Sequence, residues 1–180
     1  RESIYVGYRF FDKAKKSVQY PFGHGLSYTK FEYKDIELSK NNIKEGETLA
    51  VSFTLKNVGD FSGAEVAQVY VCPPESKIYK ADRELKGFKK VYLKAGEEAR
   101  VSIELDERAF SYYNVNINDW HAESGTYKII VAAQSYVDLV IGGAAVAVEY
   151  LQGDTGQHLV GGSFYPFGIL GKVAVPPAPE

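Results

Sequence analysis

The stretch PFGHGLSY at residues 21–28 combines a histidine, a hydroxyl group and two glycines, so it is the first candidate for chemistry. A phosphate-binding loop requires a third glycine or a lysine and a strand leading into a helix, and this stretch has neither. Ser27 lacks the glycine spacing of a nucleophile elbow. Because Gly23 and Gly25 adopt positive φ at little cost, we predict a packed corner. The large side chains available there for burial are Tyr20, Phe22, Leu26 and Tyr28.

Other reactive residue types are few and widely spaced. The three histidines, His24, His121 and His158, do not have the spacing of a metal site. His24 could be functional, but an imidazole held by backbone carbonyls is more common. Cys72 ends an apolar run and has no cysteine partner, which predicts a buried, inert thiol. The acidic residues fall in turns and on the polar phase of strands, so we predict no catalytic residue, no metal ligand and no cofactor.

Trp120, in NDWHAESG, is the single tryptophan. It precedes an apparent strand, and three roles remain open for it: a lid over one end of the core, an anchor facing a partner, or a platform on which a sugar stacks.

The charge balance excludes some partners. A net charge of −2 provides no broad basic field, so we expect no nucleic acid. Lys13, Lys15 and Lys16 form the densest basic cluster and are predicted to lie at the solvated tip of a hairpin. No apolar stretch is long enough to span a bilayer, so we expect no membrane partner. The sequence has no methionine and no signal sequence, which predicts a piece of a longer protein whose compartment stays open.

Period-two alternation dominates the middle of the chain. In ETLAVSFTLKN, Leu49, Val51 and Phe53 alternate with polar residues, as expected for a strand with one wet face. Similar runs recur about every ten residues, NNIKEG is predicted as a turn, and no convincing amphipathic helix lies between the runs. The pattern predicts an all-β protein: an antiparallel β-sandwich of about seven strands.

The two ends differ from this middle. Residues 1–30 form an irregular, aromatic-rich segment, which we call the lead segment. Residues 31–150 are predicted to form the sandwich. Residues 151–180 are rich in glycine and proline, as in a tail or a linker.

Three stretches together resemble a known domain. PFGHGLSYTKFEY, RELKGFKKVYLKAGEEARVSIELDERAFSYYN and ESGTYKIIVAAQS are similar to the C-terminal fibronectin type III-like domain of glycoside hydrolase family 3, and the resemblance covers about residues 4–140. It implies an immunoglobulin/fibronectin III-like sandwich, with the lead segment resembling the exit from that family's α/β sandwich domain. After about Asp138 the sequence departs from the family, with a longer apolar GGAAVAVEY.

The resemblance implies a retaining β-glycosidase, most often a β-glucosidase, as the parent enzyme. Its Asp nucleophile and Glu acid/base, about 5 Å apart, belong to other domains of that family. NDW at 118–120 differs from the family's Ser-Asp-Trp-like motif in its first residue, so no catalytic residue is assigned to this chain.

We therefore expect a noncatalytic domain that packs against the catalytic domains of the parent glycosidase and stabilises them. The predicted interdomain contacts are Tyr8, Arg9, Phe22, His24 and Trp120. A homo-oligomer, if one forms, is expected to assemble through the parent enzyme. The alternative is a carbohydrate-binding module that uses exposed aromatic rings.

Overall fold

A computed structural model of the chain describes residues 3–44, 46–74, 76, 78–135 and 142–149, the last range by its backbone alone. The predicted tail at residues 151–180 lies outside these residues.

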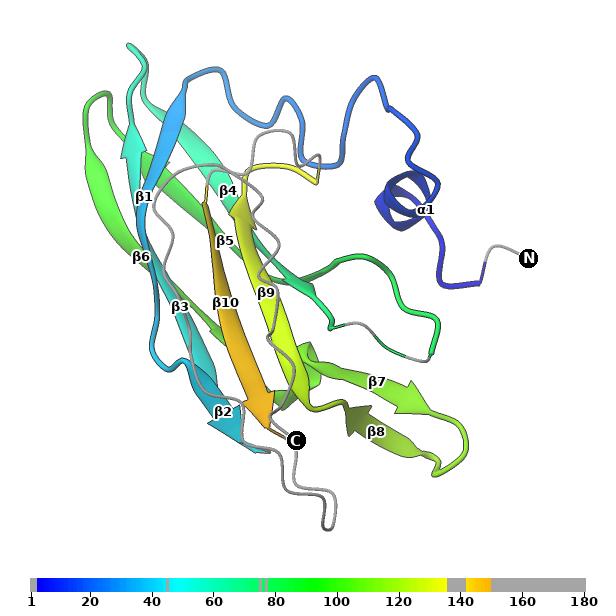
Figure 1. Ribbon diagram of the computed structural model, residues 1–180. Coiled ribbons are helices and arrows are strands. Elements are labelled where there is room, and N and C mark those ends of the chain that lie inside the picture. Colours follow the sequence, from blue (N-terminus) through cyan, green and yellow to red (C-terminus); the bar gives the residue numbers. More distant parts are fainter. Residues whose placement is uncertain (1–2, 45, 75, 77, 136–141, 150–180) are drawn as a thin grey trace, which may run out of the picture.

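Two sheets form the body of the molecule (Figure 1). The three-stranded sheet contains β1 (Phe31–Leu38), β3 (Leu49–Asn57) and β6 (Glu98–Leu105) in that spatial order. The five-stranded sheet has the order β2 (Asn42–Lys44), β10 (Gly142–Glu149), β9 (Gly125–Ala132), β4 (Gly63–Cys72) and β5 (Glu84–Leu93). The seven predicted strands correspond to β1, β3, β4, β5, β6, β9 and β10, so the prediction of an all-β sandwich is confirmed.

The core lies between the inner faces of the two sheets. Leu49, Val51 and Phe53 on β3 are fully buried, as their alternation predicts, and they pack in one cluster with Val69 and Ile129 from the opposite sheet. The predicted turn NNIKEG is partly wrong, because it contains β2. This strand pairs in parallel with β10, so its partner comes from a distant part of the chain.

The lead segment lies against the outer face of the five-stranded sheet. It contains one short helix, α1 (Tyr8–Lys13), beside the sheet on the side away from β1 (Figure 1). A second apolar cluster, Tyr70, Ile130 and Ala132, forms on that outer face, and Tyr8 packs against it. The lead segment thus adds a partial third layer to the sandwich.

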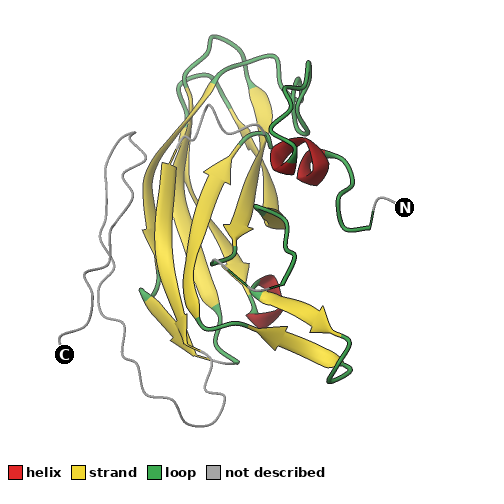
Figure 2. Ribbon diagram, turned by 45° about the vertical axis from the view of Figure 1, so that its right-hand side comes forward, coloured by secondary structure: helices red, strands yellow, loops and turns green. Residues whose placement is uncertain are grey.

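A hairpin projects from the sandwich on the same side as α1 (Figure 2). It consists of β7 (Ser111–Asn114) and β8 (Asp119–Ala122), and the 3-10 helix η1 (Glu107–Ala109) precedes it. Trp120 lies within β8, a short strand that the sequence did not predict, and it precedes β9 as expected.

Candidate interdomain surface

Four of the five predicted contact residues lie in the lead segment, and the fifth lies in the hairpin. Tyr8 and Arg9 begin α1, whereas Phe22 and His24 lie in the corner. The structure brings Tyr8 and Phe22 together, with ring centroids 6.2 Å apart. His24 is exposed and lies against Tyr20, at a centroid distance of 5.2 Å.

Tyr8 and Arg9 bind the chain's own sandwich. The Tyr8 hydroxyl accepts a hydrogen bond of 2.9 Å from the Leu85 backbone N–H, and the ring meets Tyr70 edge-to-face at 5.8 Å. Arg9 forms an ion pair of 3.3 Å with Glu84. These contacts fix the start of α1 on the start of β5.

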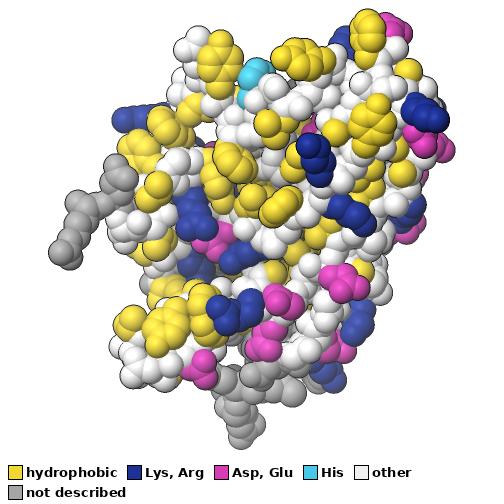
Figure 3. Space-filling model, turned by 180° about the vertical axis from the view of Figure 1, so that it is seen from behind, with side chains coloured by type: hydrophobic (Ala, Val, Ile, Leu, Met, Phe, Trp, Pro, Cys, Tyr) yellow, Lys and Arg dark blue, Asp and Glu magenta, His cyan; other side chains and the backbone are white. Residues whose placement is uncertain are grey.

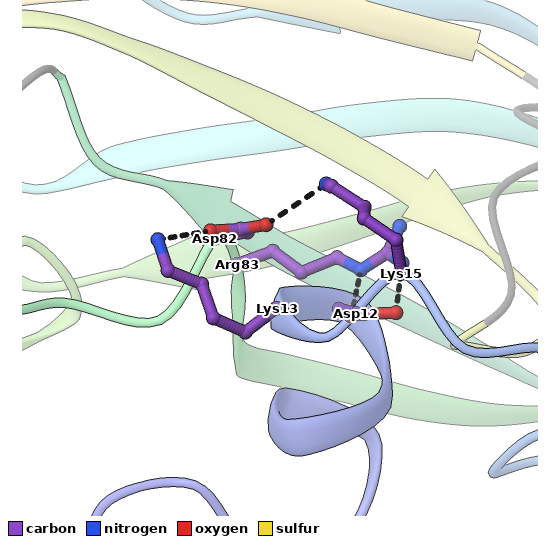
Figure 4. Close-up of polar contacts among 5 residues, drawn as sticks. All are labelled: Asp12, Lys13, Lys15, Asp82 and Arg83. Carbon is purple, nitrogen blue, oxygen red and sulfur yellow. Dashed lines mark hydrogen bonds and ion pairs between the residues drawn. The ribbon is translucent and has the colours of Figure 1, made fainter.

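A network of ion pairs reinforces this attachment (Figure 4). Arg83 donates two hydrogen bonds, of 2.7 and 2.6 Å, to the two carboxylate oxygens of Asp12, and these side chains are 12% and 13% exposed. Lys13 and Lys15 donate to Asp82 at 3.0 and 3.2 Å. The predicted tip is solvated, because both lysine side chains are exposed, but it is not part of a hairpin: Lys13 ends α1, and Lys15 lies in the turn that follows. Their partner Asp82 lies 67–69 residues away.

The charges of this network reinforce one another. Burial alone would raise the pKa of Asp82, but the hydrogen bonds and positive charges of Lys13 and Lys15 outweigh it and lower that pKa. The same hydrogen bond to Asp82 raises the pKa of Lys13. Both partners therefore stay ionised near neutral pH.

The corner PFGHGLSY is packed through its backbone. The Phe22 N–H donates to Ser135 Oγ at 3.1 Å, and the Ser135 N–H donates to the Phe22 carbonyl at 2.8 Å. Gly23 has φ +92°, and a Cβ there would lie 2.5 Å from Gln68 Nε2 and 2.6 Å from the Ala133 carbonyl oxygen. Only glycine fits this approach without a local shift.

The end of the lead segment is attached to β3 by Asn57, which is fully buried. Thr29 Oγ1 donates to Asn57 Oδ1 at 2.9 Å, and Gly59 N–H donates to the same oxygen at 3.1 Å. Asn57 Nδ2 donates to the carbonyls of Phe61 and Leu93 at 2.8 and 3.1 Å. The side-chain amide thus uses its donors and its acceptor to join the lead segment, the β3–β4 turn and the end of β5.

In contrast to these buried polar anchors, the large apolar side chains of the lead segment face outward. The exposed ones are Ile4, Val6, Phe10, Phe11, Tyr20, Phe22, Leu26 and Tyr28. The corner was expected to bury its large side chains, but the structure leaves them exposed. Figure 3 shows apolar side chains gathered along this part of the surface. Clusters of this kind mark interaction sites more often than single exposed residues do.

A groove of about 290 Å³ joins the lead segment to the hairpin. Ile4, Tyr79 and Tyr112 line it from the lead segment, the β4–β5 connection and β7 respectively. Lys80, also in its wall, pairs with Glu123 at 2.5 Å and lies 4.6 Å from the centre of the Tyr112 ring. Burial tends to raise the pKa of Glu123, but the hydrogen bonds from Lys80 and Ser76 and the charge of Lys80 together outweigh it and lower that pKa. The groove therefore combines aromatic walls with an internally neutralised ion pair.

Trp120 is not a lid over the core, because it is 43% exposed. Its ring meets Tyr113 across the hairpin at 5.8 Å, and the Arg108 guanidinium lies 3.6 Å from the ring centre. One face of the indole is therefore covered by a cation, which leaves only the opposite face for a stacked sugar.

The described residues contain no group of three histidine, cysteine or acidic side chains that could hold a metal. In the same part of the chain, no helix is long and apolar enough to cross a membrane. Cys72 is partly buried, and burial raises the pKa of its thiol to about 11, so it stays protonated near neutral pH.

Two important contacts were not predicted from the sequence. Asp12 and Arg83 are 71 residues apart, and no local pattern connects them. Asn57 did leave a signal, because it falls on the inward phase of the alternation that starts at Leu49. A polar residue on that phase indicates a buried side chain that needs hydrogen-bond partners.

Comparisons with known proteins agree with this architecture. A family model described as "Fibronectin type III-like domain" matches residues 65–135. The chain is 47% identical over 135 residues to the thermostable β-glucosidase B of Acetivibrio thermocellus, a match that covers 75% of this chain and 18% of that protein. It is 45% identical over 134 residues to an exo-α-(1→6)-L-arabinopyranosidase of Bifidobacterium longum, covering 74% of this chain and 17% of that protein.

Solved structures give the same result. The glycoside hydrolase family 3 β-glucosidase of Bifidobacterium adolescentis superposes with a TM-score of 0.75 at 39% identity, over 87% of this chain and 23% of that one. The β-glucosidase of Kluyveromyces marxianus gives a TM-score of 0.72 at 40% identity, over 82% of this chain and 18% of that one. The chain thus spans less than a quarter of the length of these relatives. Residues 65–135 are a fibronectin type III-like domain, and the chain is similar in sequence and structure to a region of glycoside hydrolase family 3 β-glucosidases.

Proposed function

We propose that this chain is a noncatalytic domain of a family 3 retaining β-glycosidase, with β-glucosidase as the expected activity of the parent enzyme. It packs against the catalytic domains through the lead segment and stabilises their arrangement.

The observation that carries this proposal is the two-sided character of the lead segment. Its polar groups are bound to the sandwich, from Asp12 on Arg83 to Thr29 on Asn57, while its large apolar side chains face outward. A segment fixed in this way presents a rigid apolar surface, which lowers the entropic cost of binding a partner.

The names of the relatives support a role that does not depend on the sugar. A β-glucosidase and an arabinopyranosidase match this chain at 47% and 45% identity, although their names give different substrates. A domain shared so closely by both enzymes suits a common structural role better than recognition of one sugar.

The test is a chimera of the Acetivibrio thermocellus β-glucosidase in which this chain replaces the matching region. Val6→Asp and Phe10→Asp introduce a charge on the outward face of the lead segment. We expect both to speed thermal inactivation of the chimera, measured with an aryl β-glucoside, and to leave the urea midpoint of the isolated chain unchanged. Phe61→Asp is the matched control, because Phe61 is an exposed apolar residue in the β3–β4 turn, outside the lead segment.

Two results would contradict the proposal. The first is turnover of aryl β-glucosides by the isolated chain. The second is an inactivation rate that no lead-segment substitution changes. Heat released when oligosaccharides are titrated into the isolated chain would instead favour a carbohydrate-binding module.

A further inference from the structure

The hairpin β7–β8 has an unusual tip. Its turn, NVNIND, holds two aliphatic residues, Val115 and Ile117, which are 73% and 53% exposed. Turns of this kind normally carry polar residues, and a two-stranded ribbon alone is marginally stable in water. Exposed aliphatic groups at the end of a projecting ribbon indicate that another surface covers them.

The strand pair Tyr113–Trp120, close to the turn, adds an aromatic group, and Arg108 of η1 adds a cation. Trp120 packs against Tyr113, and the Arg108 guanidinium lies over the Trp120 ring. No carboxylate within the described part of the chain forms an ion pair with Arg108. Tryptophan and arginine are the residue types that most often dominate binding energy at interfaces. A guanidinium already held on a ring is oriented to bind a carboxylate from outside.

The hairpin and the lead segment belong to one continuous surface. The groove between them is lined by Ile4 from the lead segment, by Tyr79 from the connection and by Tyr112 and Tyr113 from the hairpin. Both projections lie on the same side of the sandwich in Figures 1 and 2. One partner surface can therefore contact both.

We propose that the hairpin is a second docking arm, whose aliphatic tip inserts into an apolar recess on the catalytic domains, with an acidic side chain of those domains facing Arg108. This inference rests on the proposed function and names a separate contact within it. Val115 and Ile117 cannot hydrogen-bond the hydroxyls of a sugar, which favours a protein as the occupant.

The first experiment uses the same chimera. Val115→Asp and Ile117→Asp should make thermal inactivation about tenfold faster, which corresponds to about 1.4 kcal/mol. Arg108→Glu should act in the same direction, and Arg108→Lys should restore part of the loss. Phe61→Asp is again the control, because the exposure of Phe61, 70%, is similar to that of Val115. Its turn, between β3 and β4, lies at the end of the sandwich opposite the hairpin (Figure 1). An equal effect of the control would overturn the proposal.

The second experiment identifies the contact directly. Val115→benzoylphenylalanine in the chimera should crosslink, on illumination, to peptides of the catalytic domains. Crosslinks confined to this chain, or to a second copy of it, would overturn the proposal. So would sedimentation that shows the isolated chain to be a dimer which Val115→Asp dissociates.

The two proposals fail separately. If the lead-segment variants destabilise the chimera and the hairpin variants do not, the docking role stands and the docking arm is rejected. If neither set has an effect, both are rejected.

Discussion

Glu65 and Asn57 are both polar and almost fully buried, but their surroundings differ. The Asn57 amide is bound on its donor and acceptor sides. Glu65 lies on the buried phase of β4 near Tyr33, where burial raises the pKa of its carboxyl and the Tyr33 hydroxyl offsets only part of that rise. Burial thus makes ionisation of Glu65 unfavourable in the folded state.

Glu65 should therefore make stability depend on pH. Because its folded pKa is raised, the folded state holds its proton more tightly, and the free energy of unfolding falls as pH rises from the unfolded pKa, about 4.3, through the folded pKa. We expect Glu65→Gln to be more stable than the parent chain at neutral pH, with the difference shrinking towards about pH 4. Urea unfolding across this range measures it, and a difference that does not change with pH would contradict the assignment.

Asp12 and Arg83 form the least exposed ion pair of the lead segment. A double-mutant cycle with alanine at both positions should give a coupling free energy of about 1–3 kcal/mol. Glu32 and Lys34 provide the comparison, because they form a pair of 2.9 Å whose side chains are close to half exposed. Their coupling should be about 0.5 kcal/mol or less. Equal couplings for the two pairs would show that burial adds nothing to the attachment of α1.

At the scale of elements, the corner shows why two glycines in one motif need not be equivalent. Gly23 and Gly25 both have positive φ, +92° and +73°. Atoms of Gln68 and Ala133 crowd the Gly23 position, whereas the space beside Gly25 is open. The first glycine is required by contact and by conformation, and the second by conformation alone.

Alanine substitutions test this difference between Gly23 and Gly25. Gly25→Ala should cost about 1–2 kcal/mol, the usual cost of a left-handed conformation for an L-residue. Gly23→Ala should cost at least about 2 kcal/mol more, because the added methyl group forces the corner away from the sheet. Chemical denaturation of the isolated chain measures both. Similar losses would mean that the corner adjusts without strain.

At the scale of the whole molecule, the lead segment belongs physically to the sandwich. It covers Tyr70, Ile130 and Ala132 on the outer face of the five-stranded sheet, while its own outward face remains apolar. Together with the hairpin, it places exposed apolar side chains on one side of the molecule. The opposed sheets meanwhile enclose a packed apolar core.

Removing residues 1–26 should test this layer while leaving Thr29 on Asn57. We expect the truncated chain to lose about 3–6 kcal/mol of unfolding free energy, since large apolar side chains become exposed at about 1.5–3 kcal/mol each. It should also bind more of a hydrophobic fluorescent dye. An unchanged urea midpoint would show that the lead segment rests on the sheet without stabilising it.

Much of the fold followed from local pattern. The alternation of Leu49, Val51 and Phe53 predicts a strand and its buried face, because the side-chain period of a strand is two. The short strand β2 was not predicted, since its partner β10 lies about a hundred residues further along the chain. The pairing of Lys13 with Asp82 was not predicted for the same reason, because Asp82 is distant in sequence.

The sequence predicted the candidate interdomain surface only in part. The motifs predicted the type of domain, and the many aromatic residues of the lead segment set it apart from the sandwich. Which side of each residue faces outward depended on long-range contacts: Tyr8 turns inward to Leu85, while Leu26 stays exposed. The apolar tip at Val115 and Ile117 had no local signal, because exposure depends on what surrounds a residue.

The order of residues alone established the strands, their inward faces and the kind of domain, because these depend on periodicity and motifs that near neighbours carry. The fold decided how the lead segment is attached, which aromatic side chains remain exposed, and how the groove and hairpin combine into one surface. Those features depend on pairs of residues far apart in the chain, such as Asp12 and Arg83, and only folding brings such pairs together.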